Sequence, residues 1–312
     1  MPKLGYLLPT RERIMEGRPE TGRLLALAEK AEGMGFDSIW VGDSVTAKPR
    51  HDPLTLLAAV AARTGKAELG TAVLLSAMRN PVLLAHQAAT LDRLCEGRLI
   101  LGIGIAADTP AVRRDFEATG VPFDKRVARM NEGMQLCRAL WTGQPVDWSG
   151  LWTVKQGSVG PTPHRPGGPP IWYGGFQPAG RARTGRLYDG WFPSQPQPEE
   201  YAGQLDEVRA AARAAGRDPA SITAAMYVTL AIDDAPGRAD ATMNDYLERY
   251  YRMPAAETRD RERCFAGTEA AAAAWIKSYA DAGASHIVLR LVGDIERQLD
   301  IAARIRRGLG WS

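Results

Sequence analysis

The side chains of this sequence that could do chemistry gather in short loops, each directly after a run of apolar residues. The candidates that follow such runs are Asp43, Ser44, Ser76, Asp108, Gly174, Gly175 and Phe176. Carboxyl groups can exchange protons, hydroxyls can donate hydrogen bonds, and glycines let a bound group approach the backbone closely. If the apolar runs are parallel strands, their carboxyl ends meet on one face and bring these loops together. The sequence therefore predicts one site that is assembled from several loops.

A phosphate-binding position is predicted after the apolar run Pro170–Tyr173. Gly174 and Gly175 precede a predicted helix over 178–187. The start of that helix carries Gly180, Arg181 and Arg183. Free amide groups, the positive end of a helix dipole and a guanidinium all favour a phosphate. A plain turn is the alternative interpretation of the two glycines.

Few other groups indicate catalysis. His51 is the strongest functional candidate among the histidines because it lies in the loop after Ser38–Gly42, whereas His86 falls within a predicted helix. The histidines and the three cysteines lack the spacing of metal ligands. Aromatic residues near the predicted strand ends could wall a flat heteroaromatic ligand: Trp40, Trp172, Tyr173, Phe176 and Trp191. A phosphate position, aromatic walls and few acid–base groups indicate a bound cofactor that carries the chemistry.

Eight short apolar runs would position these loops. The predicted strands are Leu4–Leu8, Ser38–Gly42, Leu69–Leu75, Leu99–Ile105, Pro170–Tyr173, Gly190–Pro193, Ile222–Ile232 and His286–Leu291. Continuous rather than alternating apolar runs indicate strands buried on both faces. Eight such strands in 312 residues, mostly separated by amphipathic helices, predict an α/β protein with a single (β/α)8 TIM barrel over residues 1–312. Two segments, 144–169 and 233–266, are predicted insertions: a hairpin with a loop, and a mostly helical excursion.

Helix boundaries are predicted from capping residues. Asp52-Pro53 and Asn80-Pro81 each combine an N-cap side chain with proline at the first helical position, and Thr268 caps a later helix. A doubly wound sheet is the competing fold, supported by Gly102-x-Gly104-x-x-Ala107. That match is weak because Thr109-Pro110 follows it instead of an immediate helix, and because it does not open a βαβ domain.

Composition excludes several classes of partner. The net charge is +3 with acidic and basic residues interspersed, so no basic block exists that could follow a nucleic-acid backbone. No apolar window approaches the length of about 20 residues that crosses a bilayer, and the first apolar run is too short for a signal peptide. Three scattered cysteines fit a reducing compartment. We expect a cytoplasmic protein that acts on a small molecule, without nucleic-acid or membrane partners.

The sequence resembles the luciferase-like flavin and deazaflavin oxidoreductases over nearly its whole length, and among them the branch that uses coenzyme F420. The segments that carry the resemblance are Leu69–Val73, Arg79–Asp92, Gly97–Gly104, Leu140–Gly143, Gly174-Gly175 and Asp189–Pro193. The resemblance implies a (β/α)8 barrel that binds either F420 or FMN at the carboxyl ends of its strands. It also implies an oxidoreductase.

The resemblance further implies roles for particular residues. Amides of Gly174, Gly175 and Phe176, with the nearby Gly180 and Arg181 or Arg183, would hold the cofactor phosphate. The family often has a non-proline cis peptide in its third strand, here expected at Ala72-Val73, which forms a bulge behind the cofactor ring. Leu75 and Ser76 follow that bulge and are expected to contact the cofactor. Asp43 matches the family's acid near the polar edge of the ring.

This sequence departs from the family pattern at two positions. Deazaflavin dehydrogenases usually carry a histidine after the acid that Asp43 matches, and here Ser44 occupies that place. They often carry a glutamate after the fourth strand, where this chain has Ala106-Ala107-Asp108. A serine cannot accept a proton near neutral pH as a histidine can. The departures argue against alcohol or sugar-phosphate oxidation and favour hydride delivery to an activated C=C or C=N bond.

Three functions follow as hypotheses. The leading one is an F420-dependent oxidoreductase in which Asp43 orients the ring and Ser44, His51 and Asp108 face the substrate. The first alternative is an FMN-dependent monooxygenase that uses oxygen and a separate flavin reductase. The second is a non-catalytic flavin-binding protein. The resemblance also implies a homodimer, in which the predicted helix Pro81–Leu94 could pack against the partner.

Overall fold

The computed structural model describes residues 1–259 and 262–311. Eight parallel strands form a ring, which closes through the pairing of β8 with β9. In ring order they are β1 Lys3–Leu7, β2 Ser38–Val41, β3 Glu68–Thr71, β4 Leu99–Ile103, β7 Ile171–Tyr173, β8 Gly190–Trp191, β9 Thr223–Ile232 and β11 His286–Leu291. One further parallel strand, β10 Cys264–Gly267, pairs with the end of β9. The predicted (β/α)8 barrel is confirmed.

Helices surround the ring and connect its strands. Their bounds are α1 Thr10–Met15, α2 Thr21–Gly33, α3 Pro53–Ala61, α4 Pro81–Leu94, α5 Pro110–Ala118, α6 Arg126–Leu140, α7 Pro178–Leu187, α8 Pro198–Ala214, α9 Pro236–Tyr251, α10 Ala255–Arg259, α11 Glu269–Asp281 and α12 Ile295–Gly308. The predicted caps form: Asp52 accepts a hydrogen bond from the Thr55 amide, and Asn80 from the Val82 amide. These caps satisfy amides that an α-helix leaves without partners at its start.

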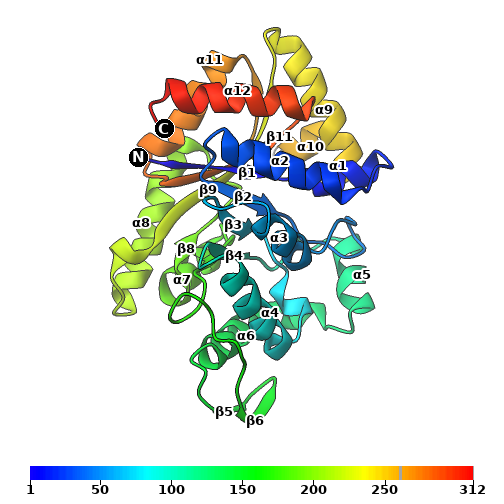
Figure 1. The fold of residues 1–312 in the computed structure, drawn as a ribbon. Coiled ribbons are helices and arrows are strands. Elements are labelled where there is room, and N and C mark those ends of the chain that lie inside the picture. Colours follow the sequence, from blue (N-terminus) through cyan, green and yellow to red (C-terminus); the bar gives the residue numbers. More distant parts are fainter. Residues whose placement is uncertain (260–261, 312) are drawn as a thin grey trace.

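The two expected insertions have the predicted character. The first contains an antiparallel hairpin of β5 Val146–Ser149 and β6 Thr153–Gly157, which projects at the bottom of Figure 1. The second contains α9 and α10 before β10. Figure 1 shows both chain termini on one side of the barrel, while α1, α5, α9 and α10 lie on the opposite side. That opposite side is where the carboxyl ends of the strands emerge.

Large aromatic rings fill the interior of the barrel. Trp40, Trp172 and Phe192 pack on one another, with Trp40 and Phe192 centroids 4.8 Å apart. Glycines make room for them, since a Cβ on Gly70 would lie 2.3 Å from the Trp40 ring. Gly102 also leaves no room for a side chain, because a Cβ there would lie 2.1 Å from the Thr71 carbonyl oxygen of the neighbouring strand. The Gly102-x-Gly104 pattern therefore serves barrel packing, and the competing doubly wound sheet is excluded.

A neutral histidine completes this interior. The Trp40 indole donates to Ser38 Oγ at 2.6 Å, and Ser38 Oγ lies 2.7 Å from His286 Nε2. Because the Ser38 hydroxyl oxygen already accepts a hydrogen bond from the indole, its own O–H can donate a hydrogen bond to Nε2. Burial, with a smaller contribution from the charge of Lys3, lowers the pKa of His286 to about 3. Glu68 Oε2 lies 3.9 Å from His286 Nδ1, which is beyond hydrogen-bond distance.

Three local expectations differ from the structure. β3 ends at Thr71 rather than Leu75, and beyond it Leu74 makes only an isolated bridge to Ile103. Thr109-Pro110, where no helix was predicted, opens α5, and the Thr109 side chain accepts a hydrogen bond from the Val112 amide. The short helix α1 was not expected, and its first turn has no side-chain cap.

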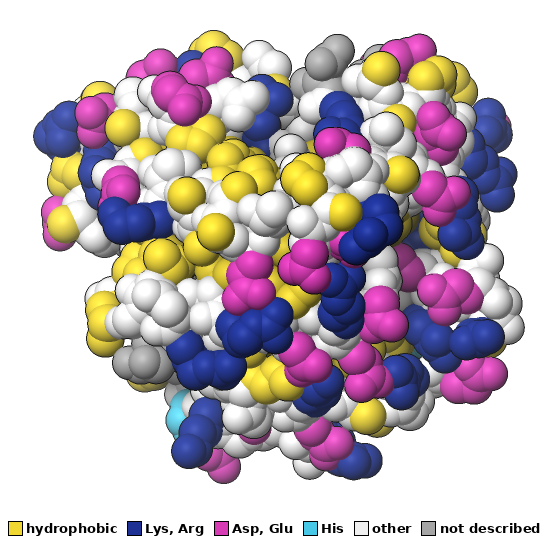
Figure 2. All heavy atoms as spheres, turned by 90° about the horizontal axis from the view of Figure 1, so that it is seen from above, with side chains coloured by type: hydrophobic (Ala, Val, Ile, Leu, Met, Phe, Trp, Pro, Cys, Tyr) yellow, Lys and Arg dark blue, Asp and Glu magenta, His cyan; other side chains and the backbone are white. Residues whose placement is uncertain are grey.

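The outer surface carries mixed charge. Figure 2, seen from the side of α11 and α12, shows acidic and basic side chains interspersed among apolar ones, without a block of one sign on that face. Among the described residues, no helix combines the length and apolar character needed to span a membrane. Within the same residues, no group of three or more His, Cys, Asp or Glu side chains is placed to hold a metal ion.

Candidate active site

Asp43 joins the end of β2 to the segment that follows β3. Its Oδ2 accepts the Leu75 amide at 2.9 Å and Arg79 Nη1 at 2.5 Å, and its Oδ1 accepts Arg79 Nη2 at 3.2 Å. The side chain is 3% exposed. A buried carboxylate with both oxygens bound in this way fixes the backbone around it. Asp43 thus holds the segment 72–79 in place at the mouth of the barrel.

That segment places a small apolar bulge at the barrel mouth. The Ala72-Val73 peptide is cis, as expected. Ala72 and Val73 pack, partly buried, on the interior aromatic cluster. A Cβ on Gly104 would lie 2.4 Å from Val73 Cγ2, and one on Gly174 would lie 3.5 Å from Val73 Cγ1. The Val73 side chain therefore lies across the ends of β4 and β7, where glycines leave space for it.

The loop after β7 offers unpaired backbone amides. The Gly174 amide donates to the Ile103 carbonyl at 3.0 Å, whereas the amides of Gly175 and Phe176 have no partner among the described residues. Gly180 lets α7 approach this loop, since a Cβ there would lie 3.0 Å from Gly175 Cα. Free amides ahead of a ten-residue helix suit an anion, as the sequence predicted.

The two arginines at the start of α7 have different orientations. Arg181 donates through Nε to Glu207 Oε2 at 2.8 Å and through Nη1 to the Phe176 carbonyl, so it supports the loop. Arg183 donates to the Tyr173 hydroxyl at 3.1 Å. No carboxylate pairs with Arg183 among the described residues. Arg183 therefore has more guanidinium donors left for an anion than Arg181 has.

Ser76 contributes an unpaired hydroxyl beside the Asp43 contact. Ser76 is 5% exposed, and its Oγ has no hydrogen-bond partner in the described structure. Buried polar groups without partners are rare and call for an explanation such as a bound ligand. The orphaned hydroxyl, the Val73 bulge and the free amides of the β7 loop fit a planar cofactor with a phosphate. Both F420 and FMN meet that description.

Ser44 and His51 stabilise loops in this structure. Ser44 Oγ donates to Asp115 Oδ2 at 3.4 Å and accepts the Lys48 amide at 2.9 Å, which ties the β2 loop to α5. His51 Nε2 donates to the Pro19 carbonyl at 3.1 Å, and its buried Nδ1 has no partner among the residues that the structure describes. In this structure, therefore, both side chains form hydrogen bonds that hold neighbouring loops together.

Asp108 lies apart from the other candidates. It pairs with Arg113 at 2.7 Å, and its side chain is 53% exposed. The hydrogen bonds from Arg113 hold the pKa of Asp108 below its usual range. The structure thus brings Asp43, Ala72, Val73, Leu75 and Ser76 together and leaves the Asp108 carboxylate on the surface.

Sequence reasoning missed a group of buried cations at the mouth, here called the cationic cluster. Its members are Arg11 of α1, Lys48 and Arg50 of the β2 loop, and Arg290 of β11. Arg290 donates to the hydroxyls of Tyr227 and Tyr251, and Arg50 Nη2 donates to the Tyr250 hydroxyl at 2.7 Å. The available signal was Arg290 itself, an arginine in phase with the inward-facing Val288 of an otherwise apolar strand.

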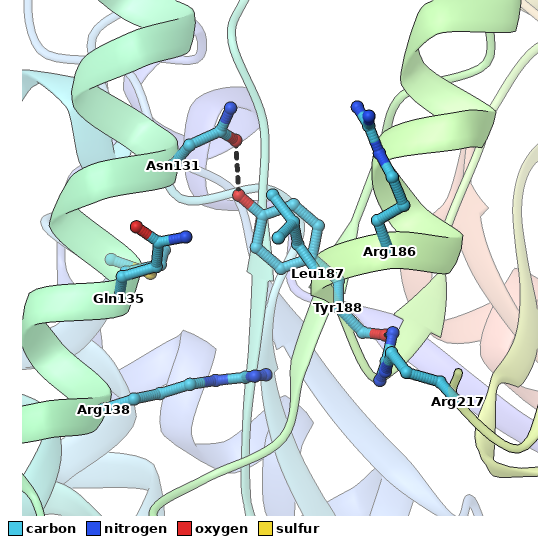
Figure 3. A pocket seen from close by; sticks show the side chains of 8 residues that line it. Asn131, Gln135, Arg138, Arg186, Leu187, Tyr188 and Arg217 are labelled. Carbon is cyan, nitrogen blue, oxygen red and sulfur yellow. Dashed lines mark hydrogen bonds between the residues drawn. The ribbon is translucent and has the colours of Figure 1, made fainter. Parts of the chain in front are cut away.

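A cavity of about 300 Å³ lies between α6 and α7, on the amino-terminal side of the barrel (Figure 3). Two of its three arginines pair with Asp189, which lies 2.7 Å from Arg138 Nη2 and 3.6 Å from Arg217 Nη2. The Tyr188 hydroxyl donates to Asn131 Oδ1 at 2.8 Å across it. Residues on this face of a barrel contribute to stability rather than catalysis. The cavity is therefore separate from the candidate active site.

Comparison with known proteins gives the family. A family model described as luciferase-like monooxygenase matches residues 1–308. A protein of Nocardia farcinica, named F420-dependent glucose-6-phosphate dehydrogenase, is 31% identical over 316 residues, which covers 91% of this chain and 94% of that protein. A phthiodiolone/phenolphthiodiolone dimycocerosates ketoreductase of Mycobacterium sp. is 37% identical over 212 residues, or 66% of this chain. The match spans only about half, 54%, of that ketoreductase.

Solved structures share the fold. An F420-dependent secondary alcohol dehydrogenase in complex with an F420-acetone adduct aligns with a TM-score of 0.83 at 20% identity, covering 97% of this chain and 98% of that one. A monooxygenase from Streptomyces bottropensis aligns with a TM-score of 0.81 at 24% identity and the same coverage of both chains. At these identities the likeness supports the barrel alone. With the family match over nearly its whole length, this chain belongs to the luciferase-like monooxygenase family, as its resemblance implied.

Proposed function

We propose that this protein is an F420-dependent oxidoreductase that transfers a hydride between the reduced deazaflavin and a small unsaturated molecule. The observation that carries the proposal is that two features occur together at one barrel mouth. They are the Val73 bulge and the backbone amides of Gly175 and Phe176 that have no partner among the described residues. F420 rather than FMN is supported by the name of the Nocardia farcinica relative, which matches over almost its whole length.

Residues at the barrel mouth would each bind a different part of the cofactor. Asp43 and Arg79 hold the segment 72–79 so that Val73 supports one face of the ring. The Ser76 hydroxyl would donate a hydrogen bond to a polar atom of the cofactor, which would give this buried hydroxyl a partner. The amides of Gly175 and Phe176, with Arg183, bind the phosphate. When bound, F420 supplies or accepts the hydride.

Titration of the cofactor-free protein with F420 and with FMN, followed by fluorescence quenching, tests this function. We expect tight binding of F420 and weak binding of FMN. Arg183→Met should weaken F420 binding about tenfold, as for one lost charge-assisted hydrogen bond. Arg186→Met is the matched control, because Arg186 lies exposed on the same helix and lines the separate cavity. Tight FMN binding without F420 binding would contradict the proposal and favour the FMN-dependent monooxygenase.

We also propose that the molecule is a homodimer that uses the outer face of α4. The inner face of this helix packs on the barrel through Leu84, Ala88 and Leu91. Leu83 and Leu94 point outward and are 63% and 58% exposed. Because 11 residues span about three helical turns, the two leucines lie along one exposed stripe of α4, which a partner subunit would cover.

A further inference from the structure

Lys48 presents a fixed ammonium group at the barrel mouth. Its backbone is held on both sides, since its amide donates to Ser44 Oγ and its carbonyl accepts Arg50 Nε. Its Nζ lies 3.9 Å from the centroid of the Tyr251 ring and 5.6 Å from that of Tyr250. Nζ has no carboxylate or hydrogen-bond partner among the described residues. Its three N–H donors are therefore available to a substrate.

A series of contacts connects Lys48 with the candidate active site. The Tyr251 hydroxyl, on the ring that Lys48 covers, accepts Arg290 Nη1 at 3.1 Å. Arg290 also donates to the hydroxyl of Tyr227. The Tyr227 ring packs on the same interior cluster as Ala72 and Val73. Lys48 and the Val73 bulge thus lie at the same mouth of the barrel. Lys48 is next to α9, and Val73 is next to the ends of β3 and β4.

The surroundings of Lys48 are rich in positive charge. The charged or titratable groups that face its loop are Arg11 of α1, Arg50 of the same loop, Asp115 of α5, Tyr250 and Tyr251 of α9, Glu262 before β10 and Arg290 of β11. The pKa of Lys48 is lowered to about 7, mainly by burial and also by the positive charges of Arg290, Arg50 and Arg11, against the opposing charge of Glu262. An ordinary lysine has a pKa near 10.4. The group can therefore give up and regain a proton near neutral pH.

The other acid–base candidates at this end of the barrel are engaged elsewhere. Asp43 is bound by Arg79, and Asp108 by Arg113 on the surface. Ser44 bonds to Asp115. His51 is held through Nε2 by the Pro19 carbonyl, and its Nδ1 is buried away from solvent. The histidine and glutamate expected from the resemblance are absent, so the proton must come from another group.

We propose that Lys48 is the proton donor and acceptor for the substrate of this enzyme, which rests on the function proposed above. In reduction, one atom of the substrate's C=C or C=N bond would receive hydride from the reduced deazaflavin. The other atom takes a proton from the Lys48 ammonium, so the π bond is replaced by two new bonds to hydrogen. The substrate gains two electrons, the deazaflavin loses two, and the neutral amine regains a proton from water. Oxidation runs these steps in reverse.

The first test needs neither cofactor nor substrate. Reductive methylation with ¹³C-formaldehyde labels the lysines of the cofactor-free protein, and NMR then follows each methylamine as the pH is raised. We expect one signal to titrate near pH 7, in line with the pKa of Lys48, and to vanish in Lys48→Arg. It should persist in Lys66→Met, a control at an exposed lysine in the loop before β3. A Lys48 signal that titrates near the ordinary value of about 10.4 would overturn the proposal.

The second test separates proton transfer from charge. Arginine keeps the positive charge but holds its proton at every accessible pH. Oxidation of enzyme-bound reduced F420 by 2-cyclohexen-1-one is followed by absorbance, with the cyclic imine 1-pyrroline as a second probe. We expect the rate of the wild type to fall as pH rises through about 7. Lys48→Arg and Lys48→Met should each be about 100-fold slower at pH 7 without that fall, while Lys66→Met keeps the wild-type rate and profile.

The outcomes distinguish the role of Lys48 from the proposed function. Lys48→Arg with the wild-type rate and pH profile would overturn the role of Lys48 and make it a purely electrostatic binding residue. Failure of the wild type to bind F420, or to reduce either probe, would instead contradict the proposed function. Affinity for F420 within threefold of the wild type, by fluorescence quenching, shows that each variant is folded around its cofactor.

Discussion

At the scale of single residues, Asp43 has a different role from the one its sequence position indicated. Its place after β2 was predicted, and its partners Leu75 and Arg79 were not, because hydrogen bonds across 32 and 36 residues leave no local signal. The same holds for Ser44, which Asp115 binds across 71 residues. Sequence placed these side chains at the correct end of the barrel, and tertiary contacts decided what each one does.

Asp43→Asn should destabilise the protein by about 2 kcal/mol. Asparagine can still accept the Leu75 amide, but the charge that pairs with the mostly buried Arg79 is lost. Urea unfolding measures the change. Asp52→Asn is the control: it also removes a carboxylate near Arg79, but that side chain is 49% exposed, and asparagine caps a helix as well as aspartate does. An equal loss in both variants would contradict the anchoring role of Asp43.

His286 should make stability depend on pH. Its pKa in the folded protein is about 3, below the value of about 6.5 expected in the unfolded chain. As the pH falls below 6.5, the unfolded chain therefore binds the proton first. The contribution of His286 to the free energy of unfolding is therefore fully present above pH 6.5. It decreases as the pH falls toward 3, by up to about 1.4 kcal/mol per pH unit.

Urea unfolding at pH 4.5 and 6.5 measures this dependence. His286→Gln should flatten the slope, because glutamine can bond to Ser38 and does not titrate. His86→Gln on the exposed face of α4 should leave the slope unchanged. A wild-type slope retained by His286→Gln would show that other groups cause it.

At the scale of elements, local chemistry set where helices begin and long-range pairing set where strands end. The starts of α3, α4 and α11 were predicted because Asp52, Asn80 and Thr268 carry their own capping signals. The Thr109-Pro110 start of α5 carried the same signal and was overlooked. The end of β3 was misplaced because the apolar run continues past Thr71, while the regular ladder stops there.

Packing of β3 on β4 at the mouth can be tested with a double-mutant cycle. A Cβ on Gly104 would lie 2.4 Å from Val73 Cγ2, so Gly104→Ala should cost about 1–3 kcal/mol by overpacking. Adding Val73→Ala should recover most of that cost, because it removes the atom that collides. Gly174→Ala is the control, since its Cβ would meet neighbours at 3.4 Å or more. Additive costs of Gly104→Ala and Val73→Ala would contradict the contact.

At the scale of the whole molecule, the barrel could be predicted and the cationic cluster could not. Continuous apolar runs of strand length, repeated through the chain, specify parallel strands buried on both faces. The cationic cluster forms between the two ends of the chain, as in the bond from Arg11 to the Tyr250 carbonyl, 239 residues apart. Its members carry no common spacing, so the closure of the barrel alone brings them together.

The proposed homodimer predicts a change in mass on surface substitution. The double variant Leu83→Glu and Leu94→Glu places two charges on the outer face of α4 and should convert the dimer to a monomer. Sedimentation equilibrium measures the mass. Leu151→Glu, at an exposed leucine of the β5–β6 hairpin, should leave the dimer intact. A wild-type protein that sediments as a monomer would contradict the proposed interface.

The central claim is that this barrel mouth transfers a hydride from F420 to an unsaturated substrate. The most direct measurement uses reduced F420 that carries deuterium at the hydride-donating carbon, mixed with the protein and 2-cyclohexen-1-one or 1-pyrroline under anaerobic conditions. Mass spectrometry then analyses the reduced product. The account predicts that one deuterium passes from the cofactor to a product carbon. A reduced product without deuterium, or no product from protein saturated with F420, would contradict it.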